Sequence, residues 1–223
     1  GSIIINKMIS KLHYITQGNT PEEHLENIQR ACASGAEWVQ LRLKKKDPKT
    51  ILETAKKARE ITAHFQTRLI INDYYKVAKE VNADGVHLGK KDACPLKVRD
   101  YLGKFYSIGG TANTLEDCKE LLTKKVDYIG LGPFQFTETK KNLSPVIGEA
   151  GYKVLIEELK TETPIIAVGG ITLDTVASII KTGVFGVAVS GAITNDFTSI
   201  PVFHQLLKAP STNEQVYKLG DNK

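Results

Sequence analysis

The stretch that decides the fold is TPIIAVGGITLDTVASIIKTGVFGVAVSG, residues 163–191. It opens on a β-branched apolar run, passes a pair of glycines, and continues into an amphipathic segment that starts at Thr172-Leu173-Asp174. Gly183 ends that segment and leads directly into a second apolar run, Gly186–Val189. A threonine cap, an acidic first turn and a C′ glycine are ordinary helix boundaries. The stretch therefore predicts a strand–helix–strand unit with parallel strands and a right-handed crossover.

The same alternation extends outward along nearly the whole chain. Eight short apolar runs predict strands, at Leu12–Thr16, Trp38–Arg42, Arg68–Asn72, Gly85–Leu88, Tyr106–Gly109, Tyr128–Leu131, Pro164–Val168 and Gly186–Val189. Further helix starts are indicated at Pro21, Pro48 and Thr114. Gly35 and Asn82, like Gly183, are placed to end a helix and lead into a strand. Eight such units favour an α/β fold closed into a (β/α)₈ TIM barrel; a doubly wound open sheet is the alternative.

The length of 223 residues fits one such barrel, because α/β barrels commonly run about 200–250 residues as a single domain. We expect one barrel domain over residues 1–210, in which Gly1-Ser2 is a cloning scar, and a polar, flexible tail over residues 211–223. Three scattered cysteines form no disulfide framework and no metal-type pair. With no apolar run long enough to span a bilayer and no signal-peptide pattern, the sequence predicts a cytoplasmic protein.

The charge pattern bounds the partners. A net charge of +5, from 30 Lys+Arg against 25 Asp+Glu, permits an anionic ligand without identifying one. Basic residues are not interleaved with aromatic residues along a stripe, which argues against nucleic acid as a partner, and nothing points to a membrane. Small-molecule substrates are therefore expected. The oligomeric state stays open, a homo-oligomer included.

In a TIM barrel the functional residues follow the C-terminal ends of the strands. The second strand ends in Gln40-Leu41-Arg42-Leu43-Lys44, and its period-two alternation puts Gln40, Arg42 and Lys44 on one face. The third and fourth strands lead into Asp73 and Asp92, each of which could simply cap the next helix. Two carboxylates beside two cations are also how proteins hold Mg²⁺ against phosphate oxygens. His87, which stands one residue out of phase with the strand end, is expected to be structural.

The remaining strand ends indicate a second anionic site. The loop after the sixth strand, residues 132–145, is the longest, and its Thr137, Thr139 and Lys140 offer hydrogen-bond donors and a positive charge. Gly169-Gly170 after the seventh strand and Ser190-Gly191 after the eighth stand where this fold usually binds phosphate. The sequence therefore predicts a monophosphate subsite beside a metal-assisted subsite for a more highly charged phosphate, such as a diphosphate.

Six stretches, in register between Leu12 and about Leu207, together resemble the thiamine-phosphate synthase family: Gln40–Lys44, Ile71–Asp73, Gly85–Asp92, Gly130–Pro133, Thr137–Lys141 and Val168–Ile171. The resemblance implies a transferase that joins hydroxymethylpyrimidine diphosphate to a thiazole phosphate, carboxylated or not. The products would be thiamine phosphate, diphosphate and, from the carboxylated substrate, CO₂. It implies dissociative chemistry, in which diphosphate leaves first and the thiazole nitrogen then captures the pyrimidine cation.

The resemblance also implies roles for individual residues. Mg²⁺ would be bound by Asp73 and Asp92. Catalytic roles would fall to Arg42, Lys44, Lys140 and Thr111. The substrates would be bound by Gln40, Leu41, Arg42, Leu43, Lys44, Asn72, Thr111, Thr137, Glu138, Thr139, Lys140, Gly170, Val189 and Ser190.

The chain departs from the usual family pattern at six positions: Leu43, Lys90, Lys91, Thr111, Asn113 and Phe136. The family usually carries Glu, Gln, Glu, Ser, His and Pro there, in that order. Two other interpretations stay open. One is a thiazole tautomerase-like isomerase on the same fold, which uses a histidine where Asn113 stands and typically lacks the metal aspartates. The other is a non-catalytic barrel that binds thiamine phosphates and acts as a regulator.

Overall fold

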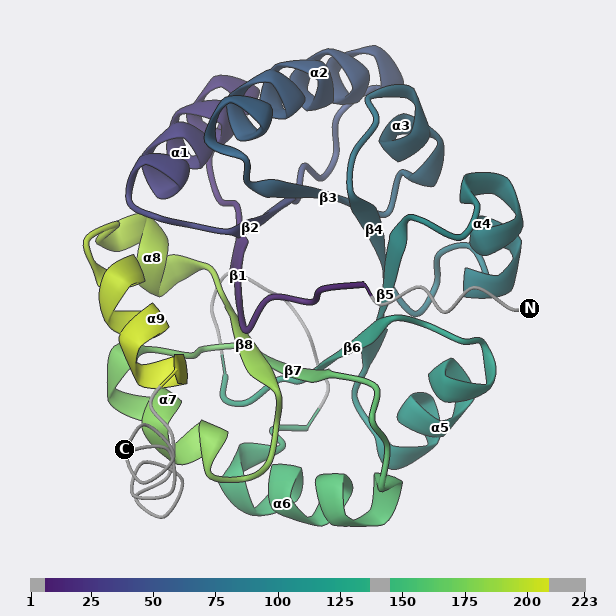
Figure 1. The fold of residues 1–223 in the computed structure, drawn as a ribbon, viewed down its shortest axis with the longest axis vertical. Helices are drawn as coiled ribbons and strands as arrows, with labels where there is room; N and C mark the ends of the chain where they lie inside the picture. The colour runs from purple at the N-terminus through teal and green to yellow at the C-terminus, as the bar shows by residue number, and fades with distance from the viewer. Residues whose placement is uncertain (1–6, 137–144, 209–223) are drawn as a thin grey trace, which may run out of the picture.

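The computed structural model describes residues 7–136 and 145–208, and in it eight parallel strands close into a barrel (Figure 1). Each strand pairs with the next along the chain, and β1 pairs with β8, which rules out the open sheet. The strands are β1 (Leu12–Ile15), β2 (Trp38–Leu41), β3 (Arg68–Asn72), β4 (Gly85–Leu88), β5 (Ser107–Ala112), β6 (Tyr128–Leu131), β7 (Ile165–Val168) and β8 (Gly186–Val189). The predicted TIM barrel is confirmed.

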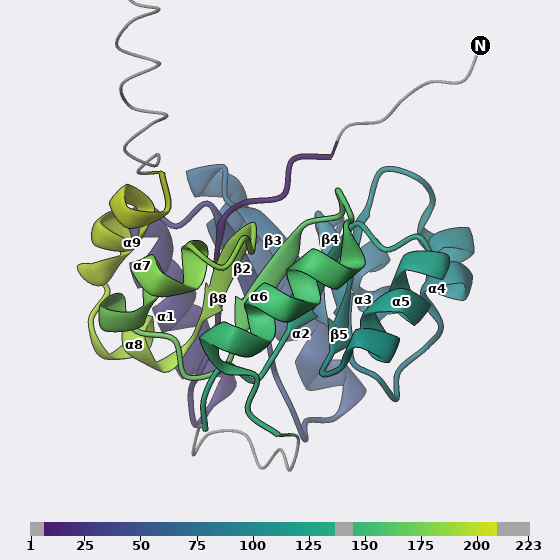
Figure 2. The same ribbon diagram turned by 90° about the horizontal axis from the view of Figure 1, so that it is seen from below.

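Helices surround the barrel (Figures 1 and 2). They are α1 (Pro21–Ala33), α2 (Pro48–Phe65), α3 (Tyr75–Glu80), α4 (Pro95–Leu102), α5 (Leu115–Thr123), α6 (Gly148–Leu159), α7 (Leu173–Ile180), α8 (Gly191–Asn195) and α9 (Ser199–Lys208). The predicted helix starts are confirmed, because Thr20, Asp47 and Thr114 accept main-chain N–H groups of the first turns and Thr172 forms a capping box. Caps of this kind each contribute about 1 kcal/mol to helix stability.

The turns that lead from helices into strands also follow the sequence pattern. Gly35 and Gly183 have φ angles of +102° and +100°, and Asn82 has a φ of +59°. These left-handed conformations favour glycine, and asparagine tolerates them better than most residues do. The chain can therefore reverse and enter the next strand without a longer loop.

The fifth strand runs later than the predicted Tyr106–Gly109, because β5 starts at Ser107 and continues to Ala112. A Cβ built on Gly109 would lie 2.0 Å from Cζ of Tyr128. The Tyr128 ring thus occupies the space where a side chain of residue 109 would stand. Glycine here reflects packing inside the barrel and not a turn.

Aromatic and aliphatic side chains together fill the barrel interior. Trp38 and Tyr128 are at most 1% exposed, and the His13 ring stacks on Trp38 with 4.3 Å between the ring centroids. Ile9, from the segment before β1, packs against the same cluster, and Figure 2 shows that segment (dark purple) lying across one end of the barrel. The interior is therefore a packed core closed at that end, which leaves the opposite end for ligands.

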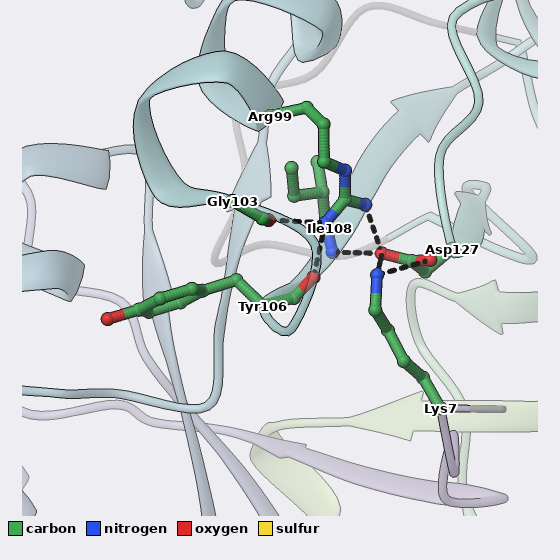
Figure 3. A network of polar contacts seen from close by, with 6 residues as sticks. All are labelled: Lys7, Arg99, Gly103, Tyr106, Ile108 and Asp127. Carbon is green, nitrogen blue, oxygen red and sulfur yellow. Dashed lines mark hydrogen bonds and ion pairs between the residues drawn. The ribbon is translucent and has the colours of Figure 1, made fainter. Parts of the chain in front are cut away.

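At the closed end, a carboxylate ties together strands, a helix and the N-terminal segment (Figure 3). Asp127 Oδ2 accepts hydrogen bonds from Ile108 N at 2.7 Å and Arg99 Nη2 at 2.5 Å, and Lys7 Nζ lies 3.0 Å from Oδ1. Arg99 Nη1 donates to the carbonyls of Gly103 and Tyr106. All three charged side chains are largely shielded, with 15–24% of their area exposed.

The same arrangement occurs two strands earlier. Asp84, just before β4, accepts a hydrogen bond from Leu69 N at 2.7 Å and one from Arg59 Nη1 at 2.9 Å. In both cases a carboxylate at the start of a strand binds a main-chain N–H of the preceding strand and an arginine from an outer helix. Such pairs fix the register between neighbouring strands.

Some sequence expectations lie outside the residues that the structure describes: the cloning scar Gly1-Ser2, the tail over residues 211–223 and most of the loop after β6. Among the helices it does describe, none has the length and apolar character needed to cross a membrane.

We expect Asp127→Ala to destabilise the protein by about 2–4 kcal/mol, because it leaves Ile108 N–H and the Arg99 guanidinium without their acceptor in a shielded place. The free energy of unfolding from urea denaturation measures this. Asp100→Ala on α4, where the side chain is exposed, is the matched control and should cost little. Equal losses in the two variants would contradict the role assigned to the Asp127 network.

Candidate active site

Two adjoining cavities open at the C-terminal ends of the strands. The first, of about 380 Å³, is called the β2–β5 cavity here, and its polar lining includes Gln40, Arg42, Lys44, Asn72, Asp73, Asp92 and Thr111. The second, of about 800 Å³, is called the β7–β1 cavity, and its lining includes Gln17, His24, Gly169, Gly170, Ser190 and Gly191. Both are lined by Ile15, Arg42, Lys44, Val168 and Ala188. Ligands in the two cavities would therefore share a wall.

Asp73 and Asp92 lie together in the β2–β5 cavity, and neither caps a helix. Asp73 has a φ of +69°, and its N–H donates to the His87 carbonyl at 2.8 Å. Asp92 Oδ2 accepts the N–H of Gly89 at 2.7 Å, which closes a tight turn between β4 and α4. The N-caps of α3 and α4 are Tyr74 and Cys94, and neither makes a side-chain capping bond. Helix capping therefore does not account for either aspartate.

The two carboxylates are electrostatically coupled. Burial raises the pKa of Asp92, and its hydrogen bond to Asp73 raises that pKa further. Burial acts upward on the pKa of Asp73 as well, but hydrogen bonds with Asp92 and Lys44 bring it below its ordinary value. Two neighbouring carboxylates therefore resist full ionisation, and a cation between them would relieve that repulsion.

The arrangement fits a hard divalent cation. A Cβ built on Gly89 would lie 2.7 Å from Asp92 Oδ2 and 3.9 Å from Asp73 Oδ1, so this glycine leaves space beside both carboxylates. Nowhere in residues 7–136 and 145–208 do three or more His, Cys, Asp or Glu side chains gather as a metal cluster. Mg²⁺ suits such a site, because it is commonly held by one or two carboxylates while water and phosphate oxygens complete its shell.

Two cations from the end of β2 flank the carboxylates. Lys44 Nζ pairs with Asp73 Oδ2, and the side chain of Lys44 stays 40% exposed. Burial lowers the pKa of Arg42, and nearby Asp73 acts in the opposite direction. Arg42 N donates to Thr16 Oγ1 at 3.1 Å, which ties the end of β2 to the end of β1. The structure thus places Arg42 and Lys44 beside each other at the mouth, where they can meet an anion.

Two buried amides lie deeper in the same cavity. Asn72 Nδ2 donates to Gln40 Oε1 at 2.9 Å, and both residues are less than 8% exposed. The other end of the Asn72 amide, Oδ1, is buried with no hydrogen-bond partner among the described residues. A buried acceptor left in this state is costly, so it is suited to receive a donor from a ligand.

His87 is not out of phase with the residues that face the site, because its ring lines the β2–β5 cavity; its structural role stays a prediction. His87 Nε2 lies 2.9 Å from Thr111 Oγ1, and Nδ1 lies 2.9 Å from the Tyr128 hydroxyl. The register between β3 and β4 pairs Asn72 with His87, so both residues sit at one level of the barrel. His87 stands two residues from both Gly85 and Gly89, and residues two apart in a strand point to the same face. This spacing is the signal that could have placed the His87 ring inside the barrel.

Glycines shape the β7–β1 cavity. Gly169 and Gly170 have φ angles of +104° and +68°, and Phe134 N and Gln135 N donate to the carbonyls of Val168 and Gly169. The chain leaving β6 thus lies against the turn after β7, and a Cβ on Gly169 would come within 2.9 Å of Pro133. This close approach requires glycine and leaves the main chain of the turn bare toward a ligand.

Other residues assigned from the sequence lie elsewhere. The side chains of Leu41 and Val189 are buried in the core between barrel and helices and line neither cavity. Leu43, 4% exposed, lines the β7–β1 cavity. The Ser190 hydroxyl donates to the Ile15 carbonyl at 2.7 Å, so only its main chain is left for a ligand. Thr137, Glu138, Thr139 and Lys140 fall outside the described residues.

Comparisons with known proteins agree with this architecture. The family model for thiamine monophosphate synthase matches residues 12–193. The thiamine-phosphate synthase of Flavobacterium psychrophilum is 44% identical over 204 residues, which cover 90% of this chain and 99% of that protein. That of Flavobacterium johnsoniae is 41% identical over 213 residues, or 94% of this chain and 98% of the relative. The structure of thiamine phosphate pyrophosphorylase from Pyrococcus furiosus matches with a TM-score of 0.78 at 27% identity, over 89% of this chain and 97% of that one.

The similarity therefore spans the entire barrel and nearly the full length of these relatives, in both sequence and structure. It includes the strand ends that form the two cavities. The chain belongs to the thiamine-phosphate synthase family of transferases.

Proposed function

We propose that this chain couples hydroxymethylpyrimidine diphosphate to a thiazole phosphate, with Mg²⁺ as cofactor, and so forms thiamine phosphate and diphosphate. The observation that carries the proposal is the pair Asp73 and Asp92 beside Arg42 and Lys44, in a cavity that shares a wall with a glycine-lined one. One cavity suits a diphosphate with its cation, and the other suits a monophosphate.

Departure of diphosphate from the pyrimidine methylene requires stabilisation of negative charge. Mg²⁺ held by Asp73 and Asp92 would supply part of that stabilisation when bound. Arg42 and Lys44 would bind the diphosphate oxygens and stabilise the charge that develops as the C–O bond breaks. The reaction makes no demand for a protein nucleophile, because the pyrimidine ring delocalises the resulting positive charge.

The deeper amides would orient the pyrimidine. Asn72 Oδ1, buried and without a partner, is placed to accept a hydrogen bond from an amino group of the ring. Gln40 holds the Asn72 amide in position, and Thr111 on β5, which lies 2.9 Å from His87 Nε2, would contact the ring from two strands further round the barrel. These contacts would keep the methylene carbon directed toward the shared wall.

The β7–β1 cavity would hold the thiazole phosphate. Main-chain groups at Gly170 and Ser190 would bind its phosphate, with Leu43 as part of the apolar surround. The thiazole nitrogen then donates its electron pair to the methylene carbon, which forms the new C–N bond. If the thiazole carries a carboxylate, loss of CO₂ returns the electrons of the broken C–C bond to the ring, which then takes up a proton from solvent.

The isomerase alternative lacks the group that it needs. Asn113 stands where that interpretation requires a histidine, and its Nδ2 donates to the Gly132 carbonyl at 2.6 Å. An amide does not titrate in the range needed to move a proton. Turnover distinguishes the proposed enzyme from the regulator alternative, because a protein that only binds thiamine phosphates would not show it.

Purified protein supplied with both substrates and Mg²⁺ should therefore form thiamine phosphate and release diphosphate in equal amounts. Chelation of the metal by EDTA should stop the reaction, and added Mg²⁺ should restore it. Chromatography of thiamine phosphate with a coupled diphosphate assay measures both products. Tight binding of thiamine phosphate without any turnover would instead support the regulator.

A second prediction concerns Asp92. We expect Asp92→Ala to lower kcat/KM by about 100-fold, because one of two metal carboxylates is lost. The free energy of unfolding should change by no more than about 1 kcal/mol, because the side chain caps no helix and the loss of its bond to Gly89 N is partly offset by relief of the repulsion from Asp73. Asp100→Ala serves again as the matched control. A large loss of stability with an unchanged rate per folded molecule would refute the metal role.

A further inference from the structure

A carboxylate outside the cavities joins two loops at the mouth of the barrel. Asp117 lies in the first turn of α5, and its Oδ2 accepts the main-chain N–H of Asn113 at 2.9 Å. The same oxygen pairs with Lys90 Nζ, also at 2.9 Å. The Asp117 side chain is 21% exposed and that of Lys90 is 46% exposed, so the pair is partly shielded from solvent.

Lys90 belongs to the turn that presents Asp92. That turn is closed by Asp92 N donating to the Gly89 carbonyl at 3.1 Å and by Gly89 N donating to Asp92 Oδ2 at 2.7 Å. Both bonds are internal to the turn, so they fix its shape but not its place relative to the barrel. The Lys90–Asp117 ion pair supplies an external attachment, to the neighbouring helix.

Asn113 extends the connection to a third loop. Its Nδ2 donates to the Gly132 carbonyl at 2.6 Å, at the point where the chain leaves β6. Asp117 thus links the turn after β4, the end of β5 and the end of β6. Lys90 and Asn113 are two of the positions at which this chain departs from the usual family pattern, and Asp117 contacts both.

We propose that Asp117 is a positioning residue for the divalent cation, acting through Lys90 to hold the Asp92 turn at the correct place opposite Asp73. This rests on the proposed function, which assigns the metal to the two aspartates. In this arrangement Lys90, which lines the β2–β5 cavity, acts as the support of the Asp92 turn and not as a direct ligand of the diphosphate. If Lys90 were a direct ligand of the diphosphate, removing the charge of Asp117 and removing that of Lys90 would have opposite effects on diphosphate binding. This difference makes the proposal testable.

The experiment measures Mn²⁺ binding to the full chain by electron paramagnetic resonance, with inorganic diphosphate present. Asp117→Asn and Lys90→Met should each weaken Mn²⁺ binding by about tenfold, as expected when a support of a metal ligand is lost. The double variant should bind no more weakly than either single one, since both remove the same contact. Lys90→Arg, which keeps the charge, should restore most of the affinity.

Two exposed residues of the same helix supply the controls. Glu116→Gln removes the same charge as Asp117→Asn, and Lys119→Met removes the same charge as Lys90→Met. Neither control should change Mn²⁺ binding or the KM for the thiazole phosphate. Thermal unfolding of every variant shows whether a loss of metal affinity occurs without a matching loss of stability, as positioning requires.

Two results would overturn the inference. One is Mn²⁺ binding by both variants as tight as in the unmodified chain. The other is tighter diphosphate binding in Asp117→Asn with weaker binding in Lys90→Met, which would make Lys90 a direct ligand. An unmodified chain that binds Mn²⁺ with diphosphate but makes no thiamine phosphate would instead overturn the proposed function and leave the positioning role of Asp117 intact.

Discussion

The pairing of β1 with β8 is the constraint on which the rest of the structure depends. Because all strands are parallel, closure of the sheet brings the ends of all eight to one ring. Residues as distant in sequence as Arg42 and Ser190 thereby line one cavity. An open sheet would separate β1 from β8 and leave the two cavities without their common wall. The opposite end of the barrel, closed by Ile9 and the Asp127 network, can then stabilise the fold without restricting the site.

Two of the cations at the mouth are paired with carboxylates, which is one reason why the net charge is a poor guide to the ligand. Lys44 pairs with Asp73, and Lys90 pairs with Asp117. The remaining repulsion lies between Asp73 and Asp92, which a divalent cation would relieve. A diphosphate alone would meet two carboxylates as well as two cations. In the proposed reaction the cation and the diphosphate would therefore stabilise each other's binding.

The strands, most helix starts and the meeting of Asp73 and Asp92 in one cavity could be predicted because they follow from local patterns: apolar runs, caps and strand ends. What could not be predicted depends on contacts between strands. His87 faces the cavity because of the register between β3 and β4. The Ser190 hydroxyl donates to the Ile15 carbonyl of β1, which lies 175 residues earlier in the sequence. Leu41 stands in a motif of binding residues but alternates onto the outer face. The ion pair between Asp117 and Lys90 joins two different strand–helix units, and no pattern in the sequence indicates it.

The shared wall also bears on the fate of the reactive cation. Once diphosphate has left, water would capture the pyrimidine methylene as readily as the thiazole nitrogen does, and the coupling would fail. The residues common to both cavities include Ile15, Val168 and Ala188, whose side chains offer water no hydrogen bonds. Burial also lowers the pKa of His13, another residue of the β2–β5 cavity, to about 3. The His13 ring therefore stays neutral and adds no positive charge beside the pyrimidine cation. In the proposed reaction this apolar part of the wall, beside Arg42 and Lys44, would let the two substrates meet while it disfavours water as the competing nucleophile.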